Sequence, residues 1–246
     1  MLKQLNKLAK KALALKGYEI RKMDKQVTEN RYFQLYNYVA ADGSFDYKKY
    51  KEVQVNGNKR KIEIVWAVEE NIQFLSNYLK EHLSSIKFGL CHGTRRGKEQ
   101  EWFRKYLGVE VIGTEISETA SEFPHTIQRD FHETKEEWIQ NVDFIYSNSF
   151  DHSYDQKKCL DSWMKCLKKG GVCIIEHTSS DVNASELDPF GADLSMMPFL
   201  VLNWSEGKYY VAEIISAPNL AVSPLIEIKK KTIEPSQRKE KFSLIK

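Results

Sequence analysis

The 246-residue chain has few cysteines, little excess charge and no long apolar run. Its four cysteines form no Cys-x-x-Cys pair, which argues against a zinc site or a disulfide framework and favours buried thiols in a reducing compartment. No apolar stretch approaches the roughly 20 residues that span a bilayer, and no signal-like segment is present. A net charge of +3 is too small to indicate nucleic acid. We therefore expect a cytoplasmic protein without a metal site, a transmembrane segment or a nucleic-acid partner.

The first part of the chain, residues 1–84, is predicted to be an extension of helices and a hairpin. Met1–Lys16 alternates leucine and alanine with lysine at helical spacing, so it predicts a basic amphipathic helix ended by Gly17. Such a helix could lie weakly on an anionic membrane surface, pack on a second subunit to form a homodimer, or pack on the body of its own chain.

A hairpin is the next predicted element, followed by a helix. Two β-rich runs, Tyr50–Val55 and Lys61–Trp66, flank the dipeptide Asn56-Gly57, which tolerates the positive φ of a tight turn. Apolar residues at helical spacing then predict a helix over Val68–Leu83.

From Ile86 the pattern alternates between strands and helices, which is typical of a parallel sheet. The predicted strands are Ile86–Cys91, Val109–Gly113, His125–Asp130, Val142–Tyr146, Val172–Glu176, Phe199–Asn203 and Tyr209–Ile215, and the predicted helices are Lys98–Leu107, Lys135–Gln140 and Gln156–Lys168. The last two strands would form an antiparallel hairpin. The sequence thus predicts an α/β fold over residues 85–226, with a doubly wound, mostly parallel, seven-stranded Rossmann-like sheet and a C-terminal hairpin. Residues 227–246 would be a basic, frayed tail.

The first of these strands runs into a glycine-bearing turn, Gly89-Leu90-Cys91-His92-Gly93-Thr94-Arg95-Arg96-Gly97. Glycines allow a close backbone approach, and the start of a helix offers free N–H groups, so this turn could hold a nucleotide-like cofactor. A glycine in such a turn can equally be a structural requirement of the fold.

Acidic residues end the next two strands. Glu115 lies 22 residues after Gly93, where a carboxylate can accept hydrogen bonds from both hydroxyls of a cofactor ribose. The alternative is a solvent-exposed glutamate. Asp130 could receive an adenine amino group while Phe131 covers the ring. The alternative for this pair is a helix cap near His132–Thr134.

The segment after the fourth strand carries a family resemblance. It runs from the apolar strand Val142–Tyr146 through Ser147-Asn148-Ser149-Phe150-Asp151-His152-Ser153-Tyr154-Asp155, an amphipathic helix and Leu167-Lys168-Lys169-Gly170-Gly171 to the apolar strand at Val172. It resembles class I S-adenosylmethionine-dependent methyltransferases, over roughly Ile86–Ile215. The resemblance implies S-adenosylmethionine as cofactor and the terminal hairpin. It also implies that residues after the fourth strand face the methyl group.

The first motif departs from the family pattern Asp/Glu-x-Gly-x-Gly-x-Gly. Gly89 stands where the acid would be, Cys91 and Arg95 stand where glycines would be, and Gly93 matches. Arg95 or Arg96 could instead reach an acidic group or simply be solvated. The residues expected to bind the cofactor are Gly93, Thr94, Arg95, Glu115, Asp130, Phe131, Asn148 and Ser149.

Methyl transfer to oxygen benefits from a base near the acceptor. His152 is the first candidate, with Asp151 beside it to orient the ring, and His177 after the fifth strand is the second. Each of these histidines could instead make a structural contact. Thr178–Met197 is expected to form part of the acceptor pocket or its lid.

Three functions remain open at this point. The favoured one is O-methylation of a small or sugar-like acceptor, because the leader with Gly17-Tyr18-Glu19-Ile20-Arg21 resembles those of bacterial glycan-modifying methyltransferases, which points to a capsule or lipopolysaccharide precursor in polysaccharide biosynthesis. A nicotinamide-dependent oxidoreductase would share the glycine turn and Glu115 but would lack the closing hairpin. A catalytically inactive, methyltransferase-like binding subunit is the third, because of the altered first motif.

Overall fold

The structure is a computed structural model that describes residues 26–177, 182–218 and 225–230. The helix expected at Met1–Lys16 lies outside these residues, so its roles at a membrane surface or in a dimer stay predictions. No helix in the described ranges is both long and apolar enough to cross a membrane.

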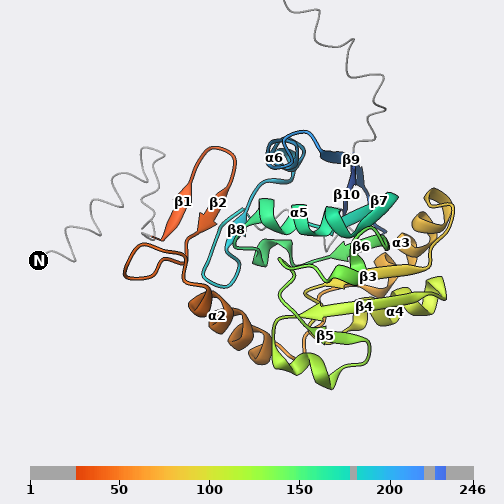
Figure 1. Cartoon of the computed structure of the whole chain (residues 1–246), viewed down its shortest axis with the longest axis horizontal. Helices are drawn as coiled ribbons and strands as arrows, with labels where there is room; N and C mark the ends of the chain where they lie inside the picture. Colours follow the sequence, from red (N-terminus) through yellow and green to blue (C-terminus); the bar gives the residue numbers. More distant parts are fainter. Residues whose placement is uncertain (1–25, 178–181, 219–224, 231–246) are drawn as a thin grey trace, which may run out of the picture.

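A seven-stranded sheet in the order β5-β4-β3-β6-β7-β10-β9 forms the centre of the molecule (Figure 1). Its strands are β3 (Phe88–His92), β4 (Glu110–Glu115), β5 (Thr126–Gln128), β6 (Val142–Ser147), β7 (Leu167–Glu176), β9 (Tyr209–Ile215) and β10 (Leu225–Lys230). Neighbours from β5 to β7 pair in parallel, whereas β10 is antiparallel to both β7 and β9. The mostly parallel sheet that closes with antiparallel strands is confirmed.

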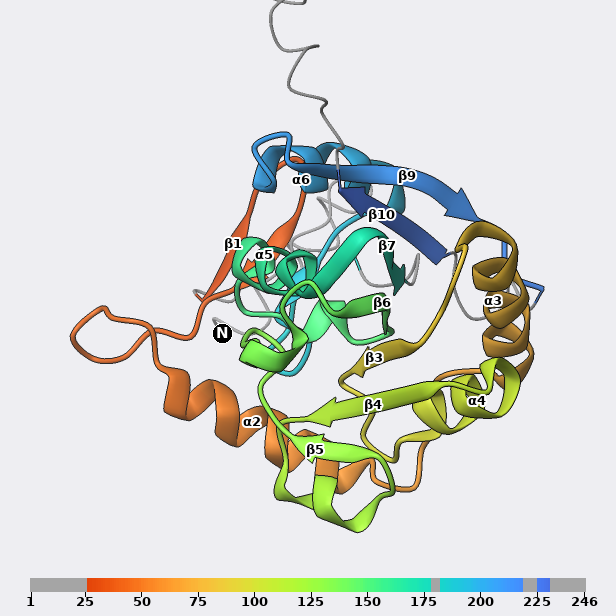
Figure 2. The ribbon, with the colours of Figure 1, turned by 45° about the vertical axis from the view of Figure 1, so that its right-hand side comes forward.

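Helices cover both faces of this sheet (Figure 2). They are α3 (Glu69–His82), α4 (Lys98–Leu107), α5 (Gln156–Cys166) and α6 (Met197–Trp204). Because successive strand residues point to opposite faces, Phe144 of β6 packs with Leu75 of α3 and Phe103 of α4, whereas Ile145 packs with Trp163 of α5. The doubly wound prediction follows from these two cores and is confirmed.

Local signals set several helix ends as the sequence predicts. The Asp155 side chain accepts a hydrogen bond from the Lys158 backbone N–H and so caps α5. Gly108 ends α4 in the left-handed conformation, at φ 70°. The short helix expected at Lys135–Gln140 is a single 3₁₀ turn, Glu136–Trp138.

The hairpin predicted around Asn56-Gly57 is wrong. Residues Tyr47–Arg60 form helix α2, which Asp46 caps by accepting from the Lys49 backbone N–H. The buried positions Tyr50, Gln54, Gly57 and Asn58 recur at helical spacing. Gly57 is small for a packing reason, since a Cβ there would lie 2.3 Å from Cδ1 of Leu187.

The partner predicted for β9 is also wrong. Phe199–Asn203 belongs to α6, whose buried residues Met197, Leu200 and Val201 follow a helical rather than an alternating period. The strand that pairs with β9 is β10, part of which was expected to be frayed tail. The sheet therefore extends to Lys230, beyond the boundary predicted at residue 226.

A small antiparallel sheet lies beside the main one, in the order β1-β2-β8. Its strands are β1 (Val27–Glu29), β2 (Gln34–Tyr36) and β8 (Phe190–Gly191). The backbone N–H of Tyr36 donates to the carbonyl of Pro189 at 2.7 Å. This bond anchors the end of the loop that carries Leu187 and Asp188.

Candidate functional site

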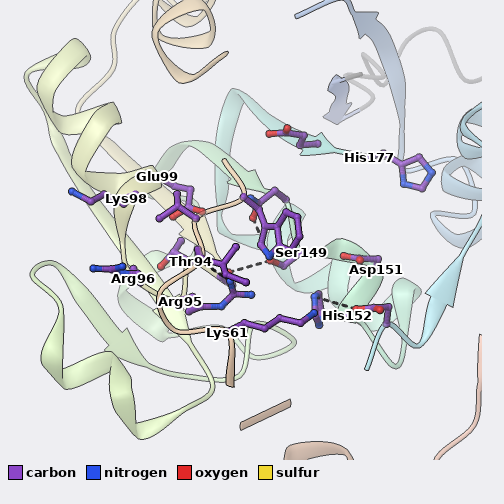
Figure 3. A pocket seen from close by; sticks show the side chains of 17 residues that line it. Lys61, Thr94, Arg95, Arg96, Lys98, Glu99, Ser149, Asp151, His152 and His177 are labelled. Carbon is purple, nitrogen blue, oxygen red and sulfur yellow. Dashed lines mark hydrogen bonds and ion pairs between the residues drawn. The ribbon is translucent and has the colours of Figure 1, made fainter. Parts of the chain in front are cut away.

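The strand order reverses at β3, which has β4 on one side and β6 on the other. Open parallel sheets bind ligands outside the carboxyl ends of their strands at such a point. A cavity of about 370 Å³ lies there, and a smaller one of about 50 Å³ adjoins it. Both cavities are lined by Lys61, Gly93, Arg95, Ser149 and His152, so we treat them as one site. Figure 3 shows side chains that line the larger cavity.

All eleven residues that the sequence nominated line this site. The smaller cavity is lined by Gly93, Arg95, Glu115, Asp130, Phe131 and Ser149 together with His152. The larger cavity is lined by Gly93, Thr94, Arg95, Asn148, Ser149, Asp151, His152 and His177. The carboxyl ends of parallel strands bring them together, and their individual roles stay predictions.

The glycine turn is held tightly against the strand end of β6. Gly93 and Thr94 both donate their backbone N–H groups to the Thr114 carbonyl, at 2.9 and 3.1 Å, and Ser149 Oγ donates to the Gly93 carbonyl at 3.0 Å. Gly93 has φ +74°, and a Cβ there would lie 2.6 Å from Cβ of Ser149. Only glycine leaves this surface open to a ligand.

Glu115 is buried at the end of β4. Its Oε2 accepts from the Arg95 backbone N–H at 3.1 Å and its Oε1 from the Ser117 backbone N–H at 2.9 Å. Burial raises the pKa of Glu115, against the effect of these two donors and the Arg95 charge. Each carboxylate oxygen keeps a further lone pair, so the side chain can still accept from a ligand in the smaller cavity.

Substitution of Glu115 should weaken cofactor binding. We expect Glu115→Ala to reduce affinity for S-adenosylhomocysteine by about 1.5–3 kcal/mol, the range for hydrogen bonds to a charged group. Calorimetric titration measures this, and the matched control is Glu110→Ala, an exposed glutamate at the other end of β4. Equal affinities for the two folded variants would contradict the assignment.

Asp130 accepts more hydrogen bonds from within the protein than the sequence suggests. Its Oδ1 accepts from the backbone N–H of His132 at 2.9 Å and from Nδ1 of the same residue at 2.7 Å, and its Oδ2 accepts from the Tyr47 hydroxyl at 2.9 Å. Although burial opposes it, the hydrogen bonds from His132 lower the pKa of Asp130. Asp130 therefore stays ionised at the edge of the smaller cavity, beside Phe131.

One wall of the smaller cavity was not foreseen from the sequence. It is the face of α2 that carries Tyr50, Gln54, Gly57 and Asn58, with Leu187 packed on Gly57. The helical spacing of these four residues after the Asp46 cap could have predicted the helix. The dipeptide Asn56-Gly57 instead indicated the turn of a hairpin.

His152 has a defined tautomer. Gln54 donates its amide Nε2 to the Leu187 carbonyl at 2.8 Å, which turns its Oε1 toward His152. Nδ1 of His152 lies 2.8 Å from that oxygen and so carries the proton. Nε2 is left with a lone pair, 3.5 Å from Oδ1 of Asp188. A proton taken up on Nε2 would be stabilised by the Asp188 carboxylate.

The two other residues expected in catalysis, His177 and Asp151, also line the larger cavity. His177 is buried, and its Nε2 lies 2.8 Å from the Ala192 carbonyl, to which it donates. Asp151 lies beside His152 in the 3₁₀ turn Phe150–His152. Gln54 and Asp188, which the sequence analysis missed, make the measured contacts to the His152 ring, whereas the sequence assigned that role to Asp151.

Within the described ranges, one group of side chains has its nitrogen and oxygen atoms close enough together to bind a cation. Asp151, His152 and Asp188 each place a ligand atom within 4.8 Å of the others. Two carboxylates and an imidazole form a donor set that several divalent metals accept. Since Nδ1 of His152 is engaged by Gln54, only its Nε2 is available to such an ion.

The larger cavity contains buried polar atoms that fit a polar ligand. Thr94 Oγ1 and Glu99 Oε2 have no hydrogen-bond partner among the described residues, and both side chains are at most 4% exposed. Buried polar atoms are rarely left unpaired, so both indicate a ligand with polar groups. Together with the open surface at Gly93, these atoms suit the amino-acid end of an adenosyl cofactor.

Comparisons with known proteins agree with this geometry. Residues 90–175, from β3 to β7, match a family model described as a methyltransferase domain. No curated protein shows a significant match in sequence. Among solved structures, the fold is similar to Burkholderia thailandensis 1,6-didemethyltoxoflavin-N1-methyltransferase, solved with 1,6-didemethyltoxoflavin and S-adenosylhomocysteine (TM-score 0.59, 16% identity, 87% of this chain and 99% of that chain). It is also similar to Streptomyces venezuelae DesVI (TM-score 0.50, 11% identity, 76% of this chain and 100% of that chain).

The topology and the family match together argue against one alternative that the sequence left open, the nicotinamide-dependent oxidoreductase. A parallel sheet that closes with the antiparallel strands β10 and β9 is the feature that a nicotinamide-dependent oxidoreductase would lack. The matched segment covers the glycine turn, Glu115 and the strand ends that line both cavities. Residues 90–175 are therefore similar to a methyltransferase domain, and the sheet around them has the Rossmann-like fold expected of class I S-adenosylmethionine-dependent methyltransferases.

Proposed function

We propose that the enzyme transfers the methyl group of S-adenosylmethionine to an oxygen of a small or sugar-like acceptor, with His152 as the base. The observation that carries this proposal is the fixed tautomer of His152, whose Nε2 lone pair belongs to a side chain that lines both cavities. A histidine held in this way can accept a proton from a hydroxyl group.

The division of the site supports a cofactor end and an acceptor end. Glu115, Asp130 and Phe131 line the smaller cavity, and their two carboxylates and aromatic ring are the groups that would contact the adenosine half of the cofactor. Figure 3 shows Thr94 and Glu99 on one side of the larger cavity and His177, Asp151 and His152 on the other. The second side is therefore where we place the acceptor.

The size and lining of the larger cavity favour a small polar acceptor. Its volume of about 370 Å³ lies in the range of small-molecule sites. Its lining is rich in charged and hydrogen-bonding side chains such as Lys61, Asp151 and Asp188, which suits a molecule with several hydroxyl groups. The Burkholderia thailandensis enzyme, which shares the fold, is named as an N1-methyltransferase of 1,6-didemethyltoxoflavin.

When bound in this site, the cofactor would supply an activated methyl group and would leave as the neutral thioether S-adenosylhomocysteine. The remaining work of the protein is alignment and proton removal. As the acceptor oxygen bonds to the methyl carbon, Nε2 of His152 takes the hydroxyl proton. Gln54 holds the ring through Nδ1, and Asp188 stabilises the imidazolium that forms.

The test is methyl transfer from isotopically labelled S-adenosylmethionine to a panel of sugar nucleotides, phenols and amines. We expect label on a hydroxyl oxygen of a sugar-like acceptor, located by NMR of the product. Label found only on nitrogen or carbon would overturn the oxygen assignment and leave the enzyme a methyltransferase. Reactions without enzyme give the background rate.

A further inference from the structure

Glu99 is a buried carboxyl group that hydrogen-bonds with Asn148 but leaves one oxygen, Oε2, unpaired in the described part of the protein. It is the second residue of α4 and only 4% exposed. Its Oε2 has no hydrogen-bond partner among the described residues, and the side chain lines the larger cavity. Burying a carboxyl group with an unpaired oxygen costs free energy, so the arrangement indicates a ligand that donates to it.

The groups around Glu99 come from four other parts of the fold. Arg95 of the glycine turn and Asn148 after β6 favour its charged form, whereas Glu176 at the end of β7 opposes it. Cys91 of β3 and Tyr146 of β6 also face it. Burial is the largest effect, and it raises the pKa of Glu99 to about 8.

Arg95 does not satisfy the unpaired oxygen. Its Nη1 donates to the Ile64 carbonyl at 2.9 Å. Glu176 accepts from the Tyr146 hydroxyl, and burial raises its pKa as well. Two buried carboxyl groups therefore border the same cavity, and a cation placed between them would be attracted to both.

The position of Glu99 relative to the cofactor identifies that cation. A cofactor that begins at Asp130 and Glu115 and passes Gly93 brings its amino-acid end to Thr94 and Asn148, which line the larger cavity together with Glu99. The turn from Gly89 to Gly97 contains no acidic residue. A carboxylate for the amino group must therefore come from another part of the chain.

We propose that Glu99 binds the α-ammonium group of the cofactor's amino-acid end, with Glu176 as the second carboxyl group beside it. This inference rests on the proposed cofactor site. An ammonium ion next to Glu99 favours the ionised carboxylate and lowers its pKa. Below pH 8 the free enzyme holds a proton on Glu99, so binding should release that proton. Affinity should accordingly rise with pH and level off above about pH 8.

The experiment compares two ligands that differ at the amino-acid end. S-adenosylhomocysteine carries the ammonium group, and 5′-methylthioadenosine lacks the whole amino-acid end. Both are titrated calorimetrically at pH 7 in buffers of different ionisation enthalpy, against the wild-type chain, Glu99→Gln and the control Glu101→Gln. Glu101 lies on the same helix but is exposed and paired with Lys98.

The wild type and the control should release about one proton with S-adenosylhomocysteine, whereas Glu99→Gln should release none from this group. The variant should bind S-adenosylhomocysteine about 10–100-fold more weakly, the range for a lost charged hydrogen bond, and should bind 5′-methylthioadenosine as the wild type does. Normal binding of 5′-methylthioadenosine also shows that the variant is folded.

Two other outcomes separate the failures. If neither ligand binds the wild type, the cofactor site itself is misplaced. If 5′-methylthioadenosine binds and Glu99→Gln retains wild-type affinity and proton release with S-adenosylhomocysteine, the role of Glu99 is overturned and the cofactor site stands.

Discussion

Replacing His152 by alanine should lower the rate of methyl transfer by about 10²–10⁴, the usual cost of losing a general base. The reason is that Nε2 is the ring nitrogen left with a lone pair once Gln54 holds Nδ1. Without it, the acceptor proton has no partner as the new bond forms. Turnover is measured with saturating acceptor, and cofactor affinity is measured separately with S-adenosylhomocysteine and should change little.

The control for this variant is His125→Asn. His125 is exposed, has φ 56° and lines neither cavity, and asparagine tolerates that backbone conformation. His177→Ala tests the other candidate base. Near-full turnover of His152→Ala would exclude His152, and full activity of both histidine variants would leave alignment alone as the source of catalysis.

Substitution of Gly93 should remove cofactor binding altogether. A valine there would place Cβ 2.6 Å from Cβ of Ser149 and 2.8 Å from its Oγ, at φ +74°. A β-branched residue is strongly disfavoured at positive φ, and its methyl groups would fill the surface along which the cofactor lies. We expect Gly93→Val to show no calorimetric binding of S-adenosylhomocysteine while its circular dichroism retains the α/β spectrum.

Gly108→Val is the matched control for the backbone. Gly108 has φ +70°, yet a Cβ there meets nothing within 4 Å, and it lies outside both cavities. The Gly108→Val variant should be less stable than the wild type but should bind the cofactor with wild-type affinity. Should Gly93→Val fail to fold, Gly93→Ala allows the same comparison, because it keeps the close Cβ contact but lacks the two γ-methyl groups. Wild-type affinity in a folded Gly93 variant would place the cofactor elsewhere.

The central sheet could be predicted because its signals are local. Strands such as Val142–Ser147 are continuous apolar runs, and α4 is bounded by Gly97 and Gly108, so each element is marked within its own segment. The element α2 was not predictable in this way. Its run of lysine and valine resembles an exposed strand. A glycine is needed at position 57 because Leu187, which is distant in the sequence, packs against it.

The strand β10 was missed for a related reason. The apolar run around Glu227 is short and is interrupted and followed by charged residues. In the structure, however, Glu227 is buried, and its strand pairs with both β7 and β9. Only the complete sheet creates an environment in which this segment is a strand. By contrast, Phe199–Asn203 is as apolar as a buried strand, and packing rather than composition makes it helical.

The residues of the candidate site divide in the same way, into those that local sequence marks and those that contacts distant in the sequence place. Gly93 and Glu115 were predictable because the carboxyl ends of parallel strands meet at one edge. Glu99 was not, because Lys98-Glu99-Gln100-Glu101 has the composition of a solvated helix surface. Its surroundings include Asn148, which follows β6, and Glu176, at the end of β7, and both are distant from it in the sequence. Gln54 and Asp188 reach His152 from segments whose positions the sequence could not give.

Chemical labelling of the four buried cysteines can be used to follow how often the core of the protein opens. Cys91, Cys159 and Cys173 are 0% exposed and Cys166 is 2% exposed. Burial raises the pKa of all four thiols, so almost none is in the reactive thiolate form. A thiol reagent should therefore modify the native chain only as fast as its core opens. Because a bound cofactor stabilises the closed form, the labelling rate would register ligand occupancy from inside the core, without any engineered probe.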